Sequence, residues 1–248
     1  MRYFFEIVYR GGGYHGWQNQ ANALGVQQVA EEALSKIFRK PIAIVGSGRT
    51  DAGVHCTQQF FHADIEDDFK PEEWLRRLNS FLPRDIAIRS IREVKPDAHA
   101  RYSAISRSYL YRITTTKNPM LSGMAFRYFK PLDISLMNEA ARLIAGEHNF
   151  ESFSKVKTDV NHFRCHVKNC KWEKKGEEIL FHITANRFLR GMVRALTGTM
   201  LDVGTKKISI GNFKEILNSR DRRKAGMNVS PDGLYLCAVK YPKSIFKK

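Results

Sequence analysis

Segments with a two-residue apolar period alternate along this chain with segments of helical period, and this alternation limits the possible folds more than any other sequence feature. Residues 2–9 place four large apolar side chains on one side of an expected strand, with the remaining residues on the other side. Residues 26–38 repeat apolar side chains at intervals of three and four, which predicts an amphipathic helix. The mixture indicates an α+β or α/β protein.

The same two patterns continue to the end of the chain. Further strands are expected at residues 42–46, 86–94, 108–114, 163–172 and 179–183, near Ile208, and at 234–239, and further helices at 71–82, 133–145, 188–200 and 212–218. A length of 248 residues permits one large or two small domains. From the pattern of strands and helices we expect two similar-sized domains, residues 1–104 and 105–248.

The charge balance favours a polyanionic partner. Lys and Arg number 41 against 25 Asp and Glu, a formal net charge of +16, and such a surplus attracts nucleic acid. No stretch approaches the ~20 apolar residues that a membrane span requires, and the apolar start is too short for a signal peptide. Four scattered cysteines suit a reducing compartment. We therefore expect a soluble, cytoplasmic protein that binds no membrane.

One cluster raises the question of a metal site. His162, Cys165, His166 and Cys170 lie within nine residues of one another, but the surrounding pattern predicts a β-hairpin. On a strand Cys165 and Cys170 face opposite sides, and His166 and Cys170 are roughly 13 Å apart at ~3.3 Å per residue. One zinc ion does not bridge that distance, so we expect no metal.

The octapeptide 48–55, with the sequence GRTDAGVH, presents one carboxylate, Asp51, between Arg49 and a flexible Ala-Gly pair. It follows a β-branched run that ends at Gly46, which is how a nucleophile or base is presented at a loop tip. The alternative is a surface turn in which Asp51 bonds nearby backbone amides. Local composition alone favours the turn.

A second feature is the expected strand at 108–114, where Tyr109 and Tyr111 share one face. For Tyr111 a core position is the better interpretation. For Tyr109 a core position and a role in stacking on a nucleobase are equally well supported, because arginines flank it on a basic chain.

Basic residues gather at three further places. Arg187, Arg190 and Arg194 recur at spacings of three and four, which indicates either an anion-facing stripe or an ordinary solvated face. Candidates for phosphate contact are Arg187, Arg190, the run Arg220, Arg222, Arg223 and Lys224, and the tail Lys243, Lys247 and Lys248.

Together these residues resemble the tRNA pseudouridine synthases that modify the anticodon arm, the TruA group. The octapeptide resembles the catalytic motif of that family, and nearly the whole chain is covered by ordered blocks of landmark residues. The blocks are Tyr14 to Gln18, Val26 and Gln27, Ala100 to Ala104, Arg107, Tyr109 and Tyr111, Gly146 to His148 with Phe150 and Phe153, Ala185 to Gly198, and Pro231 to Tyr241.

The resemblance implies a pseudouridine-synthase core. In that fold two α/β-type domains with mainly antiparallel, mixed sheets join side by side, helices pack on the sheet faces, and the catalytic cleft lies between the domains. It also implies a homodimer that binds tRNA and needs no cofactor. The expected substrate is a uridine of the anticodon stem-loop, at tRNA positions 38–40.

The resemblance further implies roles for individual residues. Asp51 is expected to be the catalytic nucleophile, and Arg194 its ion-pair partner. Tyr109 is expected to stack on the target base, with general-base catalysis as a less secure second role. Arg49 is expected to fill the space left by the extruded uridine, or to bond the loop backbone instead. Attack at the ribose, attack at the base and a glycal route all remain open, and His55 is assigned no catalytic role.

Two other function classes fit less well. A non-catalytic RNA-binding or RNA-folding protein explains the charge and the aromatic residues, but it has no need of Asp51, Tyr109 and Arg194 together. A phosphate-loop enzyme requires a Gly-Lys-Ser/Thr signature, and none follows Gly11 to Gly13 or Gly46 to Gly48.

Overall fold

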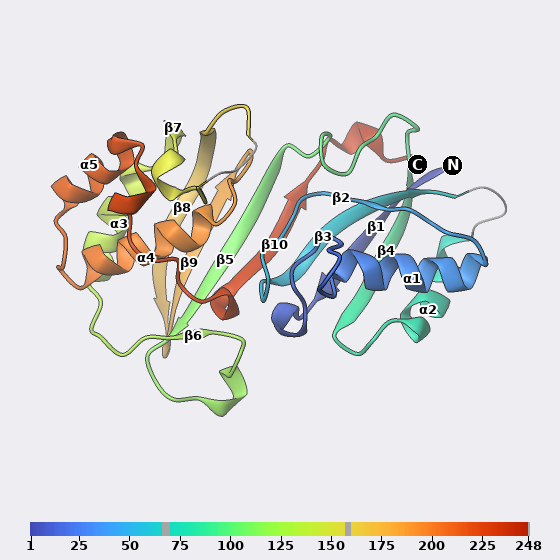
Figure 1. Ribbon diagram of the computed structural model, residues 1–248, viewed down its shortest axis with the longest axis horizontal. Helices are drawn as coiled ribbons and strands as arrows, with labels where there is room; N and C mark the ends of the chain where they lie inside the picture. Colours follow the sequence, from blue (N-terminus) through green and yellow to red (C-terminus); the bar gives the residue numbers. More distant parts are fainter. Residues whose placement is uncertain (66–69, 157–159, 248) are drawn as a thin grey trace. The chain divides into compact units, whose positions relative to one another are not determined.

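The chain forms two compact units in the computed structural model, which describes residues 1–65, 70–156 and 160–247. One unit comprises Met1–Ile105 and Leu236–Lys248, and the other Ser106–Tyr235 (Figure 1). Each unit combines a mainly antiparallel sheet with α-helices, which confirms the predicted α+β class. The predicted division at residues 104 and 105 stays a prediction.

The first unit is built on the strand order β4–β1–β3–β10, with the short β2 paired to β3. Neighbouring pairs among β1, β2, β3 and β4 are antiparallel, and Phe5 of β1 lies opposite Phe61 of β3 and Ile91 of β4. Its elements are β1 (Arg2–Tyr9), α1 (Val26–Phe38), β2 (Val45–Gly46), β3 (His55–Asp64), α2 (Pro71–Phe81), β4 (Ile86–Val94) and β10 (Leu234–Lys240).

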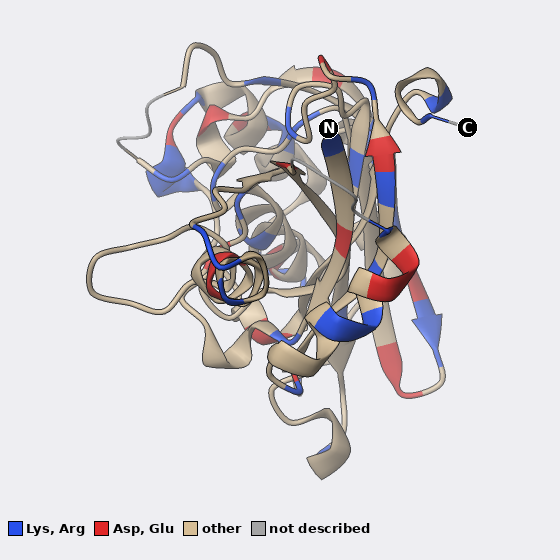
Figure 2. Cartoon of the chain, turned by 90° about the vertical axis from the view of Figure 1, so that its right-hand side faces the viewer, with Lys and Arg blue, Asp and Glu red and all other residues tan. Residues whose placement is uncertain are grey.

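Both helices of this unit follow from local sequence signals. α1 ends where Arg39 adopts the left-handed conformation, with φ of 54°. α2 begins with Pro71, and Glu72 and Glu73 occupy its first turn, where the helix dipole favours negative charge (Figure 2). Phe38 of α1 stacks on Trp74 of α2 at 4.8 Å between ring centroids, which joins the two helices.

Strand β3 is absent from the sequence prediction because it lacks a two-residue apolar period. Residues 59–63 are all buried, so both faces of the strand are covered. Two of these residues are polar, and both are hydrogen-bonded: Gln59 accepts from the Tyr9 hydroxyl at 2.9 Å, and His62 accepts from the Ala100 amide at 3.1 Å. Periodicity cannot detect a strand whose polar residues are buried by specific partners.

The second unit has the strand order β5–β9–β8–β7, in which every neighbouring pair is antiparallel, and β6 pairs in parallel with β5. Its elements are β5 (Ser106–Thr114), β6 (Phe126–Arg127), α3 (Ile134–Leu143), β7 (Gly146–Asn149), β8 (Arg164–Lys175), β9 (Glu178–Ala185), α4 (Met192–Gly204) and α5 (Ile210–Ser219). The predicted hairpin is confirmed as β8 and β9.

Helix α4 forms the centre of the second core. All its residues are buried except Arg194 and Asp202. Trp172 of β8 stacks on Phe181 of β9 at 4.5 Å, and the Trp172 indole nitrogen donates to Met200 of α4 at 3.2 Å. These contacts pack helix α4 against strands β8 and β9.

Three sequence expectations are wrong. Of residues 42–46, only Val45 and Gly46 form a strand. No strand forms near Ile208, because the chain turns there toward Ser209, which caps α5 through a capping box. The helix expected from Phe188 begins at Met192, because Gly191 adopts φ of 74° and interrupts the helical backbone.

No helix among residues 1–65, 70–156 and 160–247 has the length and apolar character needed to cross a membrane.

The buried His62 makes the stability of the first unit depend on pH. Burial, together with the positive charge of Arg2, lowers the pKa of His62 to about 4. Between pH ~6.5 and ~4 the unfolded chain therefore binds a proton that the folded protein does not, so the free energy of unfolding falls as the pH is lowered through this range.

Urea denaturation at pH 7 and pH 4.5 tests this prediction. His62→Gln keeps an acceptor for the Ala100 amide but cannot titrate. We expect the wild type to lose up to about 3 kcal/mol more than this variant between the two pH values. Equal losses in the two proteins would contradict the assignment.

Candidate active site

Residues 47–54 form the loop between β2 and β3, here called the Asp51 loop. This loop contains the octapeptide except for its last residue, His55, which begins β3. Backbone hydrogen bonds fix it to the segment that follows β1. The Trp17 amide donates to the Thr50 carbonyl at 3.3 Å, and the Gly53 amide donates to the Tyr14 carbonyl at 3.1 Å. The backbone is therefore held on both sides of Asp51.

Hydrogen bonds from buried side chains also hold the Asp51 loop. The Tyr9 hydroxyl donates to Gln59 at 2.9 Å and also bonds the Thr50 hydroxyl at 2.8 Å. The Gln59 amide in turn donates to the Gly48 carbonyl at 3.1 Å. Gln59 is completely buried and Thr50 is 8% exposed. Such a satisfied buried polar network specifies one loop conformation.

Two glycines allow the backbone to approach this closely. Gly16 has φ of 90°, and a Cβ atom there would lie 2.4 Å from the Thr50 carbonyl oxygen. A Cβ atom at Gly11 would lie 2.0 Å from the Val54 carbonyl oxygen. Any side chain at either position would displace the Asp51 loop.

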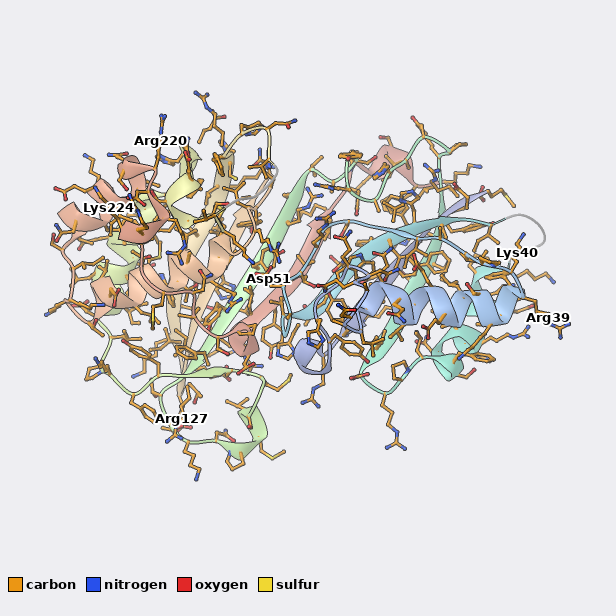
Figure 3. All side chains as sticks on the ribbon, in the orientation of Figure 1. Arg39, Lys40, Asp51, Arg127, Arg220 and Lys224 are labelled. Carbon is orange, nitrogen blue, oxygen red and sulfur yellow. The ribbon has the colours of Figure 1, made fainter. Side chains whose placement is uncertain are left out.

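Asp51, labelled in Figure 3, is half-buried on this loop. Its neighbours Arg49 and Ala52 are exposed. The Asp51 carbonyl accepts from the Val54 amide at 3.2 Å, so the segment is a tight turn as well as the support for a carboxylate. This bond involves the backbone of Asp51 and not its carboxylate, so the catalytic interpretation of the octapeptide stays a prediction. His55 is 2% exposed and accepts from the Gly11 amide at 3.1 Å, which is a structural role.

In the second unit, Tyr109 lies on β5 and is half-exposed. The ring of Phe188 meets it edge-on, with centroids 5.0 Å apart. Tyr111 is completely buried and donates to the Ser230 carbonyl at 2.7 Å, and burial raises its pKa well above the usual value. The predicted core position of Tyr111 is confirmed.

Arg194 lies in the first turn of α4 and is the half-exposed residue among buried neighbours. Its Nε donates to the Val229 carbonyl at 2.7 Å, and the Val229 amide donates back to the Arg194 carbonyl at 3.4 Å. The bond at Nε fixes the plane of the guanidinium group, so the direction of its terminal nitrogens is set by residue 229.

Arg222 supports the residues that hold Arg194, here called the 225–229 segment. One of its terminal nitrogens donates to the carbonyls of Ala225 at 3.2 Å and Gly226 at 3.0 Å. The other donates to the Asn228 side chain at 3.0 Å. Predicted as an RNA-binding residue, Arg222 makes these intramolecular bonds in the structure.

Close packing on α4 holds the same segment. A Cβ atom at Gly198 would lie 1.9 Å from the Met227 carbonyl oxygen, and the Gly226 amide donates to the Thr199 hydroxyl at 2.9 Å. The position of Val229 therefore depends on both Arg222 and α4.

The expected arginine stripe does not lie on one helix face. Because α4 begins at Met192, Arg187 and Arg190 precede the helix and only Arg194 belongs to it. Arg187 contacts the His162 ring at 3.2 Å, and Arg190 is exposed.

The remaining basic candidates differ in how they are held. Arg223 pairs with Asp221 at 2.8 Å while its side chain stays 88% exposed, and its hydrogen bonds keep the pKa of Asp221 at about 2. Lys224 is exposed at the end of the 3-10 helix η4 (Arg222–Lys224) (Figure 3). In the tail, Lys247 pairs with Glu93 at 2.6 Å, and Lys248 lies outside the described residues.

The predicted site residues are divided between the two units. Arg49 and Asp51 belong to the first, and Tyr109, Arg187, Arg190, Arg194, Arg222, Arg223 and Lys224 to the second. The pairing of Asp51 with Arg194 stays a prediction. Sequence reasoning missed the supporting residues Tyr9, Gln59 and Val229, and no local signal marks them because their partners are distant in sequence.

The two cysteines of the β8–β9 hairpin, Cys165 and Cys170, pack within the second unit. Cys165 is buried, and the Cys170 thiol donates to the Ala141 carbonyl at 2.9 Å. Within the described parts of the chain, no group of three or more His, Cys, Asp or Glu residues is placed to hold a metal ion.

Comparison with known proteins reveals relatives along the full chain. The family model described as tRNA pseudouridine synthase matches residues 7–103 and 140–242, a range that includes Asp51 and Arg194 but not Tyr109. The tRNA pseudouridine synthase A of Porphyromonas gingivalis is 46% identical over 99% of both chains. That of Bacteroides thetaiotaomicron is 43% identical over 100% of this chain and 93% of its own.

A more distant relative gives the same result. The tRNA pseudouridine synthase A of Legionella pneumophila (strain Lens) is 39% identical over 98% of this chain and 94% of its own. Among solved structures, one titled "Crystal Structure of a Cbf5-Nop10-Gar1 Complex" aligns with a TM-score of 0.38 at 10% identity, over 94% of this chain and 57% of that chain. A likeness that weak carries no argument.

The geometry around Arg222 predicts a stability effect. Arg222→Ala removes three hydrogen bonds from a charged donor to the 225–229 segment, so we expect the free energy of unfolding to fall by about 1–3 kcal/mol. Arg222→Lys should restore little, because an ammonium group lacks the planar fork.

Arg223→Ala is the matched control. Its exposed pair with Asp221 should change stability by less than about 0.5 kcal/mol. Chemical denaturation of the three variants and the wild type measures these differences, and equal effects of the two alanine substitutions would refute a supporting role for Arg222.

Proposed function

From the premise that this chain belongs to the tRNA pseudouridine synthase family, and so isomerises uridine to pseudouridine in tRNA, we propose that Asp51 is its catalytic carboxylate. The observation that carries the proposal is the half-buried position of Asp51 on a loop held by Tyr9, Thr50 and Gln59. A reacting group needs a fixed position, and this loop supplies one.

The reaction explains why a carboxylate is needed. The glycosidic bond from the uracil nitrogen to the ribose breaks, the ring turns, and a new bond forms between the ribose and carbon five of the base. A carboxylate can form a covalent intermediate and leave again, or it can remove a proton from the sugar. The proposal covers attack at the ribose, attack at the base and a glycal route.

Arg194 is proposed to pair with Asp51 and keep it ionised. The bond from Arg194 Nε to the Val229 carbonyl, 2.7 Å long, supports this role because it orients the guanidinium before substrate binds. Tyr109 is proposed to stack on the target uracil, and its edge contact with Phe188 holds the ring in place. A second role of Tyr109 as general base for the proton at carbon five belongs to the same proposal.

Substrate binding is proposed to rest on phosphate contacts. The net charge of +16 supports it, and the exposed Arg190, Arg223 and Lys224, with Arg187, are the candidate contacts. Arg222 is a further candidate contact, and it also supports the 225–229 segment. Arg49, exposed beside Asp51, is proposed to occupy the space of the extruded uridine.

The finer assignments rest on the family resemblance. We propose that the target uridines lie at positions 38–40 of the anticodon stem-loop, that the protein acts as a homodimer in the cytoplasm, and that it uses no cofactor or metal. The non-catalytic alternative predicts tRNA binding without isomerisation.

Asp51→Asn tests the catalytic assignment. Unmodified tRNA labelled with tritium at uracil carbon five releases the label when pseudouridine forms. We expect wild type to release it, and Asp51→Asn to do so at least about 1,000-fold more slowly while binding tRNA.

Asp97→Asn, at an exposed carboxylate of the same unit, is the matched control and should release tritium at the wild-type rate. A fully active Asp51→Asn variant would refute the assignment, and an inactive wild type that binds tRNA would favour the non-catalytic alternative.

Arg194→Ala tests the orienting role. Loss of a charged hydrogen bond costs about 1.5–3 kcal/mol, so we expect kcat to fall by roughly 10- to 150-fold with tRNA affinity changed much less. Arg187→Ala should show the opposite pattern, with weaker binding and a reduced salt dependence. If Arg194→Ala lowered only the affinity, Arg194 would be a phosphate contact.

A further inference from the structure

Several hydrogen bonds hold the turn that follows β4, residues 98–103, although the tip of this turn is exposed. Ala98 and Ala100 are buried, and the backbone around them is fixed by side chains from distant parts of the unit. The Ala98 carbonyl accepts from Arg2 at 3.0 Å, and the Ala100 carbonyl accepts from the Tyr241 hydroxyl at 2.6 Å. The Ala100 amide also donates to His62.

His99 fixes the tip of this turn. Its Nδ1 accepts from the backbone amides of Arg101 at 3.1 Å and Tyr102 at 3.3 Å. Its own amide donates to the Ser103 hydroxyl at 2.9 Å. Because Nδ1 is an acceptor and burial lowers the pKa of His99, the ring is neutral at pH 7.

The tip presents an aromatic ring and a guanidinium to solvent. Tyr102 is 76% exposed, yet its ring lies on the His99 ring with centroids 4.4 Å apart. Arg101 places its guanidinium carbon 5.6 Å from the centre of the Tyr102 ring. The phenol buries little of its area, so the fold gains little stability from a large aromatic residue here.

We propose that the Arg101–Tyr102 tip is a stacking platform for an unpaired nucleobase of the tRNA, with Arg101 on the adjoining phosphate. The proposal rests on the proposed function, because it takes tRNA as the ligand. The ring is ordered before binding by His99, so stacking a base costs little conformational entropy. The guanidinium of Arg101 lies over the Tyr102 ring, and an aromatic ring with a cation so close complements a base joined to a phosphate.

The alternative for an exposed aromatic is contact with a protein, including a second copy of this chain. A protein contact requires apolar area, whereas a nucleobase requires a flat ring. Tyr102→Leu separates the two, since leucine keeps apolar area and removes the ring.

The experiment measures equilibrium binding of unmodified tRNA to the full-length protein at several salt concentrations. We expect Tyr102→Phe to bind as tightly as the wild type, and Tyr102→Leu and Tyr102→Ala to bind about 5- to 150-fold more weakly. The dependence of affinity on salt should be unchanged by Tyr102→Leu and reduced by about one phosphate contact in Arg101→Gln.

Phe81→Leu, at a 50% exposed aromatic of α2, is the matched control and should bind normally. Thermal unfolding and sedimentation of each variant measure folding and oligomeric state. The proposal is overturned if Tyr102→Leu binds like the wild type, if Phe81→Leu is equally weakened, or if the loss at Tyr102 follows a change in oligomeric state or unfolding.

Failure of the proposed function gives a different result. In that case the wild type would not release tritium from labelled tRNA, whatever the Tyr102 variants do. A wild type that isomerises tRNA, with a Tyr102→Leu variant of normal affinity, would overturn the platform alone.

Discussion

The buried hydrogen bonds among Tyr9, Thr50 and Gln59 are the interaction on which the shape of the Asp51 loop depends. Each comes from a different segment, namely β1, the Asp51 loop and β3, so the loop cannot take its shape until both strands pair. A polar network of this kind is costly to bury unless every group is satisfied. The loop therefore keeps one conformation, and the half-buried Asp51 inherits its position from the sheet.

The second unit uses the same principle with a different structure. Arg194 lies on a buried helix, but the direction of its guanidinium is set by Val229, whose segment is held by Arg222 and by the close contact at Gly198. In both units other residues hold the segment that carries or orients the group: Gln59 bonds the Asp51 loop, and Arg222 bonds the 225–229 segment. Such supporting residues are hard to recognise in a sequence, because their partners are set by the fold.

The strands and helices whose apolar residues follow a regular period could be predicted from the sequence. Strand β1 and helices α1 and α2 agree with the pattern of apolar residues: alternate residues of β1 from Tyr3 to Tyr9 are buried, and the buried residues of α1 recur at helical spacing. Strand β3 escaped detection because residues 59–63 are buried on both faces, with Gln59 and His62 among them. Helix α4 was placed too early because the left-handed backbone of Gly191 does not interrupt apolar spacing. Composition also could not show that the Arg222 guanidinium bonds the 225–229 segment, and its assignment to RNA contact stays a prediction.

The net charge of the chain does not by itself decide which basic residues can orient a substrate. With 41 basic and 25 acidic residues, the chain carries a surplus of 16 positive charges in any fold. That surplus attracts a polyanion over a long range but does not orient it. Orientation requires charges whose position is fixed before binding. Arg194 meets that requirement through the carbonyl of Val229, whereas Lys224 is an exposed side chain at the end of η4, just before the segment that Arg222 holds. In the catalytic role that we propose for Asp51, its carboxylate approaches an anionic substrate, and cations of fixed position are needed to offset the repulsion, so the fixed position of a few cations matters more for this role than the net charge.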